Sequence, residues 1–182
     1  LMINSLITNQ LNNKNIVFIG MPSVGKSYFG QKISRKYNLH YVDCDILMEH
    51  KYGKKLGEIL KELGDKNFCE FEEKTICNIF FQNTIISPGG SVVYSSKIMN
   101  HLKNLNSIFI YLYLDINLLK KRLGNLKKRG VIIKHGMTFQ NLFNEREILY
   151  EKYSDFKIDC TNKTETNIMN NIRKIIFNQS KL

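Results

Sequence analysis

Short apolar runs alternate along the chain with segments in which apolar residues recur at helical spacing. Residues 15–20 form a short run that is apolar from Ile16 to Ile19 and ends in glycine, which is typical of a strand buried in a parallel sheet. In residues 26–37, by contrast, Phe29, Ile33 and Tyr37 fall on one face of a helix. Further strands are predicted at residues 40–44, 84–87, 107–114 and 156–160. Further helices are predicted at residues 46–52, 55–63, 68–81, 95–105, 116–123, 138–153 and 165–177.

This alternation of strand and helix predicts the α/β class, with three layers (α/β/α) built on a parallel five-stranded sheet. A chain of 182 residues is long enough for one ordinary domain, which we place at residues 15–178. A polar, asparagine-rich extension precedes it at residues 1–14, and the basic, irregular stretch at about 124–137 is predicted to be a lid. No apolar run approaches the roughly 18 residues of a membrane span, so no membrane partner is expected.

The net charge of +11 can arise in two ways. It can indicate binding of phosphates or nucleic acid, or it can reflect the general abundance of lysine in a chain that is also rich in asparagine and isoleucine. The lysines are dispersed, without an arginine stripe or interleaved aromatic residues, which favours the second origin. We therefore expect no nucleic-acid partner and a monomer or weak oligomer.

The four cysteines have no CxxC spacing, so a zinc site is not expected. Cys44 and Cys77 fall within apolar patterns and are predicted to be buried thiols. No signal peptide is visible at the N-terminus. A cytoplasmic location is the expectation that fits these features.

Residues 20–27 read GMPSVGKS and fit the phosphate-binding pattern GxxxxGK[ST]. The segment follows a predicted strand and opens a predicted helix, so its backbone N–H groups and the helix N-terminus would face phosphates. Lys26 would reach the β- and γ-phosphates, and the Ser27 hydroxyl would bind magnesium. ATP and Mg²⁺ are thus the expected cofactors. The predicted nucleotide-binding residues are Gly20, Pro22, Ser23, Val24, Gly25, Lys26, Ser27 and Tyr28.

Two acidic residues, Asp43 and Asp45, follow the second predicted strand. In an extended segment residues two apart face the same side, so both carboxylates can point into a cleft beside the phosphate loop. One could hold the magnesium shell or accept a hydroxyl proton from an acceptor, and the other could hydrogen-bond acceptor hydroxyls. The alternative is a polar strand end followed by a helix cap, with Asp45 capping the helix at 46–52.

In order along the chain, these motifs resemble those of the shikimate kinase family of P-loop NTPases. Residues 68–72, FCEFE, match an FRxxE motif with Cys69 in place of arginine. Residues 87–91, SPGGS, match a glycine-rich turn with Pro88 in place of its first glycine. Arg146 and Tyr150 match an R-x-x-x-Y helix.

The resemblance implies transfer of the γ-phosphoryl group of ATP to a hydroxyl of a small hydroxylated acid, shikimate, giving shikimate 3-phosphate. It implies that Arg122 stacks on adenine and that Arg129, which Gly130 follows, is the lid arginine. Under this resemblance the catalytic residues are Lys26, Asp43 and Arg129. The metal residues are Ser27 and Asp43, and the acceptor residues are Asp45, Gly89, Gly90 and Arg146.

The sequence leaves alternatives to this function open. Three arginines normally grip the acid in this family, and Cys69 removes one, which favours a relative that acts on another small acid or polyol. A catalytically inactive binding domain is a further alternative. Individually, Arg146 could pair with Glu145 or Glu151 on a solvated helix, and Arg129 could belong to a solvated basic run. Glu72 could face solvent or support Asp45, and Gly89 and Gly90 could form a plain turn.

Overall fold

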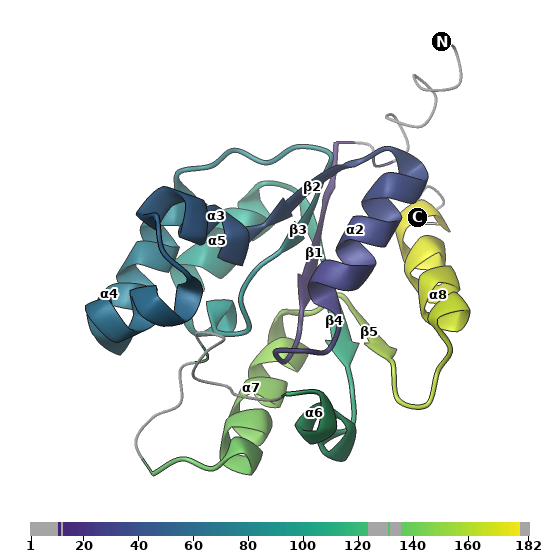
Figure 1. Ribbon diagram of the computed structural model, residues 1–182. Coiled ribbons are helices and arrows are strands. Elements are labelled where there is room, and N and C mark those ends of the chain that lie inside the picture. Colours follow the sequence, from purple (N-terminus) through teal and green to yellow (C-terminus); the bar gives the residue numbers. More distant parts are fainter. Residues whose placement is uncertain (1–10, 12, 124–130, 132–135, 179–182) are drawn as a thin grey trace.

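The computed structural model describes residues 11, 13–123, 131 and 136–178, and a parallel sheet of five strands forms its centre (Figure 1). The strand order is β2-β3-β1-β4-β5, which confirms the predicted parallel sheet. β1 pairs with β4 along its whole length, from Asn15 opposite Ser107 to Ile19 opposite Tyr111. The strands are β1 (Asn15–Ile19), β2 (His40–Asp43), β3 (Thr84–Ser87), β4 (Ser107–Tyr113) and β5 (Phe156–Asp159).

Helices cover both faces of this sheet, as the alternating pattern predicts. Figure 1 shows α2 in front of the strands and α5 behind them. α2 packs against α8, whereas α5 packs against α4 and β4. The helices are α2 (Lys26–Tyr37), α3 (Cys44–Tyr52), α4 (Leu56–Cys77), α5 (Ser96–Asn104), α6 (Ile116–Arg122), α7 (Phe139–Tyr153) and α8 (Glu165–Asn178), with a 3₁₀ turn η2 (Val92–Tyr94).

The central strand β1 is buried along its five residues, and even its polar first residue has its hydrogen bonds satisfied. The Asn15 side-chain amide donates to the carbonyl oxygens of Phe81 (2.9 Å) and Leu105 (2.8 Å). Its oxygen accepts from the Thr84 backbone N–H at 3.0 Å. A buried amide with satisfied hydrogen bonds is stable in a core, and this one joins the starts of β1 and β3 to the end of α5.

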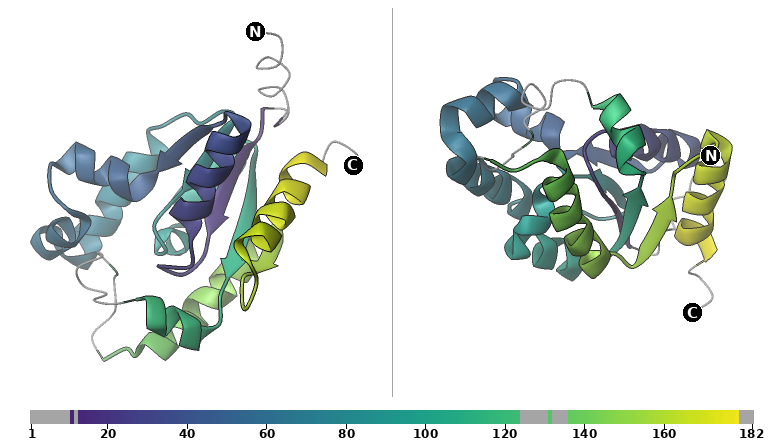
Figure 2. Two further views of the ribbon diagram at one scale, coloured as in Figure 1. Left: turned by 45° about the vertical axis from the view of Figure 1, so that its right-hand side comes forward. Right: turned by 90° about the horizontal axis from the view of Figure 1, so that it is seen from below.

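α3 and α4 form a lobe with a small core of its own, made by Met48, Leu56, Ile59 and Phe68. Both views of Figure 2 show this lobe on the opposite side of the sheet from α8. The sequence predicted two helices in this range, and the backbone of Gly64 inside α4 is not helical (φ 70°, ψ 168°), so α4 consists of two helical segments joined at a kink. Glycine tolerates this positive φ, so the chain can change direction between the two segments.

α3 begins at Cys44, earlier than predicted, because Asp43 rather than Asp45 is its N-cap. The Asp43 backbone is extended (φ −97°, ψ 114°), and its side chain accepts hydrogen bonds from the backbone N–H groups of Asp45 and Ile46. The alternative in which Asp45 caps the helix is therefore wrong, since Asp45 already lies in the first turn.

The structure tests the predicted burial of two cysteines, whereas it describes only a small part of the predicted N-terminal extension and lid. Cys44 is buried, as predicted, and Cys77 is half-buried. No helix in the described part of the chain is long and apolar enough to cross a membrane. Most of the predicted extension at 1–14 and most of the predicted lid at 124–137 lie outside the described residues. Val131, within the lid range, is described and is only 8% exposed.

Candidate active site

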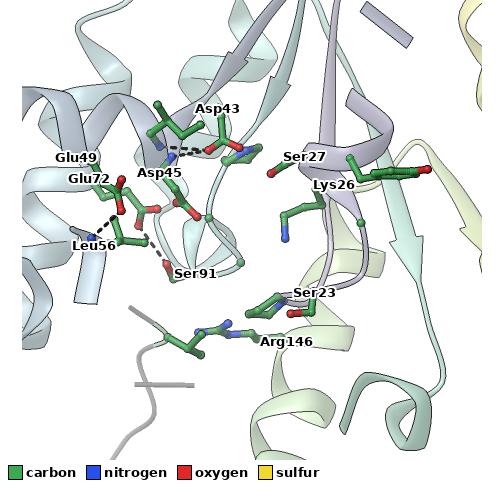
Figure 3. Close-up of a pocket in the computed structure, with 18 of the residues that line it drawn as sticks. Ser23, Lys26, Ser27, Asp43, Asp45, Glu49, Leu56, Glu72, Ser91 and Arg146 are labelled. Atoms are coloured by element: carbon green, nitrogen blue, oxygen red, sulfur yellow. Dashed lines mark hydrogen bonds between the residues drawn. The ribbon is translucent and has the colours of Figure 1, made fainter. Parts of the chain in front are cut away.

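A pocket of about 670 Å³ joins the phosphate loop to the acidic pair, the glycine turn and α7 (Figure 3). Its walls are formed where β1, β2 and β3 end, which is where parallel α/β sheets bind ligands. Most of the residues predicted from the sequence line it: Pro22, Ser23, Gly25, Lys26, Ser27, Tyr28, Asp43, Asp45, Gly89, Gly90, Arg122 and Arg146. Gly20 and Val24 are not among the lining residues, and Arg129 lies outside the described part of the chain.

Two glycines shape the phosphate loop. Gly20 has a φ of 144°, and an added Cβ there would lie 2.5 Å from the Leu112 carbonyl oxygen, so no other residue fits without a shift of β4. Gly25 has a φ of 115° and is the N-cap of α2. Because glycine has no side chain, it cannot cap the first N–H groups of α2, and these remain available to an anion. Val24 is 1% exposed and packs into the core.

Lys26 is a buried cation at the centre of this loop, with only 8% of its surface exposed. Its Nζ donates to the carbonyl oxygens of Gly20 (2.9 Å) and Met21 (3.2 Å). Burial lowers the pKa of Lys26 to about 8, against the attraction of Asp45. A buried charge that has neutral carbonyl partners is expected to bind an anion strongly, which fits a nucleotide phosphate.

The acidic pair serves two different structural purposes. Asp43 caps α3, and its second carboxylate oxygen accepts a hydrogen bond from the Tyr41 hydroxyl at 3.2 Å. Asp45 lies in the first turn of α3, and burial together with the Asp43 charge raises its pKa to about 6, while Lys26 lowers it. Both carboxylates line the pocket, so the alternative in which Asp43 and Asp45 form only a strand end and a cap does not describe their positions.

The donors beside the phosphate loop fit a magnesium ion that keeps part of its water shell. Ser27 is exposed and lines the pocket together with Asp43. The described residues contain no cluster of three or more His, Cys, Asp or Glu side chains that could hold a metal. Magnesium usually binds through one or two protein oxygens plus waters and substrate phosphates, so such a sparse donor set suits it.

Glu72 lies inside the pocket wall, which rules out a solvent-facing position and agrees with a place beside Asp45. It is 3% exposed, and its Oε2 accepts a hydrogen bond from the Ser91 hydroxyl at 3.3 Å. Burial, and then the Asp45 charge, raises the pKa of Glu72 to about 7. An added Cβ at Gly89 would lie 3.0 Å from oxygens of both Asp45 and Glu72, so the turn packs its backbone directly against the two acids.

Arg146 is buried at 1% exposure, so it is not a solvated helix residue. An added Cβ at Gly90 would lie 3.1 Å from its Nη1. Tyr150, one turn along α7, donates a hydrogen bond from its hydroxyl to the Gly90 carbonyl oxygen at 2.7 Å. α7 thus holds the glycine turn and brings the guanidinium to the same place, as Figure 3 shows for Arg146.

Some pocket residues were not predicted as site residues. Pro88 and Phe68 lie within the quoted motifs, so the motifs could have indicated them, whereas Ile46, Glu49 and Leu56 carried no signal. Cys69, one residue after the lining residue Phe68, is exposed. The full set of additional lining residues is Ile46, Glu49, Leu56, Phe68, Glu72, Pro88, Ser91 and Val131.

A family model described as Shikimate kinase matches residues 22–177. The chain belongs to the shikimate kinase family. It is 31% identical over 164 residues to a shikimate kinase of Bacillus anthracis, covering 90% of this chain and 98% of that one. It is 32% identical over 165 residues to a shikimate kinase of Staphylococcus haemolyticus, covering 89% and 95%.

Solved structures agree with the fold. A shikimate kinase from Acinetobacter baumannii in complex with shikimate superposes with a TM-score of 0.85 at 19% identity, covering 97% of this chain and 99% of that one. A thymidylate kinase from Candida albicans superposes with a TM-score of 0.60 at 14% identity, covering 92% of each chain. The predicted P-loop α/β fold is confirmed.

Proposed function

We propose that the protein is an ATP- and Mg²⁺-dependent kinase that phosphorylates a hydroxyl of shikimate. The observation that carries the proposal is a single pocket. It joins the buried cation of the phosphate loop, Lys26, to two carboxylates and to a buried arginine, Arg146. Membership of the shikimate kinase family and the shikimate complex of a protein with the same fold support the choice of acceptor.

The nucleotide would be held by the phosphate loop. The uncapped start of α2 and Lys26 would bind its phosphates, and Arg122 and Tyr28 line the same pocket for its base and sugar. Ser27 and Asp43 would hold the magnesium ion, Asp43 through water. The ion would neutralise charge on the phosphates, and the protein would contribute mainly by positioning the nucleotide and the acceptor.

The acceptor would lie over the turn at Gly89 and Gly90. With a pKa of about 6, Asp45 is mostly ionised at neutral pH and can accept a hydrogen bond, and then a proton, from an acceptor hydroxyl. Arg146 would bind the carboxylate of the acid, since guanidinium and carboxylate form short charge-assisted bonds. Arg129 stays a prediction of the sequence as the lid residue that reaches the transferred phosphoryl group.

The decisive experiment measures ADP formation with ATP and Mg²⁺ over a panel of acceptors. The panel contains shikimate, the primary alcohol obtained by reducing its carboxylate, other small hydroxy acids and polyols. Phosphorylated product is identified by ³¹P NMR. Reactions without acceptor report simple ATP hydrolysis, and the Lys26→Ala protein reports contaminating kinases.

We expect shikimate to give the highest kcat/KM of the panel. Turnover of another acid or polyol, without turnover of shikimate, would reassign the acceptor while keeping the kinase chemistry. ATP binding without transfer to any acceptor would identify a catalytically inactive binding domain instead.

A further inference from the structure

Tyr94, at the end of η2, lies against the guanidinium of Arg146, which comes from α7. The Arg146 Nε donates a hydrogen bond to the Tyr94 hydroxyl at 3.4 Å. The guanidinium carbon is 5.3 Å from the centre of the Tyr94 ring, within the range of a cation–π contact. Tyr94 itself is 40% exposed, whereas the arginine that it contacts is almost completely buried.

The two contacts restrain the arginine in different ways. The ring restrains the plane of the guanidinium, and the hydroxyl takes up the Nε donor. Gly90 closes the side near Nη1, and its carbonyl is in turn held by Tyr150. The Nη groups carry the other donors of the guanidinium, and guanidinium donors suit hydrogen bonds to a carboxylate.

Tyr94 is itself restrained by α7. Its hydroxyl also hydrogen-bonds with Glu145, the residue before Arg146. Burial and this bond raise the pKa of Tyr94. A phenol hydroxyl can donate one hydrogen bond and accept others, so it can link Glu145 to Arg146. The Tyr94 side chain therefore interacts with two successive residues of α7, Glu145 and Arg146.

The orientation of Arg146 matters because positive charge is scarce in the pocket. Among the described lining residues the cationic side chains are Lys26, Arg122 and Arg146. Lys26 sits on the carbonyl oxygens of the phosphate loop. Cys69 is exposed and brings no positive charge to the wall beside Glu72. Of the described arginines, Arg146 is thus the one that lies at the glycine turn and can bind an acidic acceptor there.

We propose that Tyr94 is a positioning residue for the acceptor: it fixes the Arg146 guanidinium in the orientation that binds the acceptor's carboxylate, and so contributes to specificity for an acid. This inference rests on the proposed function. It differs from a packing role, because a packing residue would affect stability, or all substrates alike.

The test compares Tyr94→Phe, Tyr94→Leu and wild type with shikimate and with its primary alcohol. Tyr37→Phe is the matched control, because Tyr37 lies at the far end of α2 and packs against Phe177. Loss of the hydroxyl in Tyr94→Phe should raise the KM for shikimate about threefold to tenfold. Tyr94→Leu, which also loses the ring, should raise it about tenfold or more. kcat and the KM for ATP should stay within about twofold of wild type, as should every constant of Tyr37→Phe.

Two further measurements separate positioning from packing. The KM for the alcohol, which has no carboxylate, should be the same in wild type and Tyr94→Phe. In an Arg146→Lys background, Tyr94→Phe should not raise the KM for shikimate any further, because the two residues act through one interaction. An equal rise in the KM for the acid and for the alcohol would overturn the inference, as would additive increases in the KM for shikimate in the double variant.

The inference and the proposed function fail in different ways. A wild-type protein that gives no shikimate-dependent ADP refutes the proposed function, and this inference with it. A wild-type protein that turns over shikimate, with an unchanged KM in Tyr94→Phe, refutes the role of Tyr94 alone.

Discussion

Asp43 caps the helix that carries Asp45: the Asp45 backbone N–H donates to Asp43 Oδ1 at 3.0 Å. The other Asp43 oxygen, Oδ2, accepts from the Tyr41 hydroxyl at 3.2 Å. The Asp43 carboxylate is thereby fixed by the backbone that follows it. The Asp45 carboxylate lies in the first turn of α3, close to Gly89 and Glu72, and is attracted by Lys26.

This relationship separates the charge of Asp43 from its capping role. Asp43→Asn keeps a good N-cap and removes the charge, so we expect a stable protein that needs more Mg²⁺ for half-maximal rate. Asp43→Ala removes both and should also lose about 1 kcal/mol of stability. Initial rates over a Mg²⁺ titration, together with urea unfolding, distinguish the two variants. An unchanged Mg²⁺ dependence in Asp43→Asn would argue against a place for Asp43 in the metal shell.

Lys26→Ala should abolish phosphoryl transfer, with a fall in kcat of at least about 100-fold, because the variant lacks the positive charge that would contact the β- and γ-phosphates. Its stability should not decrease much, because burial already disfavours the charged form of Lys26. The exposed residue Lys36 of the same helix gives the control variant Lys36→Ala. ADP formation and thermal unfolding are the two measurements. Near-normal turnover in Lys26→Ala would refute the role of the phosphate loop.

Asp45→Asn should damage acceptor use, with a higher KM for shikimate and a lower kcat, and leave the KM for ATP nearly unchanged. The pKa of about 6 gives this residue a pH signature. Below that pH the carboxyl is protonated and cannot accept a proton, so kcat/KM for shikimate in the wild type should fall as the pH drops through about 6. The same acidic limb should be absent from the profile of Asp45→Asn.

Cys69→Arg should lower the KM for shikimate. A charged hydrogen bond is worth about 1.5–3 kcal/mol, which corresponds to roughly tenfold to a hundredfold in affinity. Cys69 follows the pocket residue Phe68 and precedes the pocket residue Glu72 by three positions in α4, so we expect a longer side chain at this position to reach the pocket. Cys69→Ser is the control for the loss of the thiol. If the wild type already binds shikimate tightly, another residue supplies the missing charge. Lys66, three residues before Cys69, is the first candidate, and Lys66→Ala tests it.

Glu72 should make the protein less stable as the pH rises. Its pKa in the folded state, about 7, lies above the ordinary value of 4.5, so between these values the folded state binds more protons than the unfolded state. The free energy of unfolding therefore decreases with rising pH in this window, by about 3 kcal/mol at roughly 1.36 kcal/mol per pH unit. Glu72→Gln should remove this loss. Urea unfolding at about pH 5 and pH 8 measures it, and an unchanged pH slope in the variant would contradict the prediction.

Much of this molecule could be predicted from local pattern. The apolar run of β1, the glycines of the phosphate loop and the helical spacing of α2 are consequences of backbone geometry and side-chain periodicity. Since parallel strands need helical crossovers, the alternation of these elements also predicts the layered sheet. The position of the phosphate-binding residues at the end of β1 follows from the motif itself.

What the sequence could not determine depends on contacts between distant segments. Which aspartate caps α3 was decided by the extended backbone of Asp43 at the end of β2, whereas the sequence offered Asp45 as the alternative cap. The burial of Glu72 and Arg146 depends on how α4 and α7 pack around the turn at Gly89 and Gly90. A helical arginine or glutamate can have the same neighbouring sequence pattern whether its side chain faces water or a pocket. The sequence by itself therefore determined the fold and the phosphate loop, whereas the contact of Tyr94 with Arg146, 52 residues apart, was decided only when the tertiary structure brought η2 against α7.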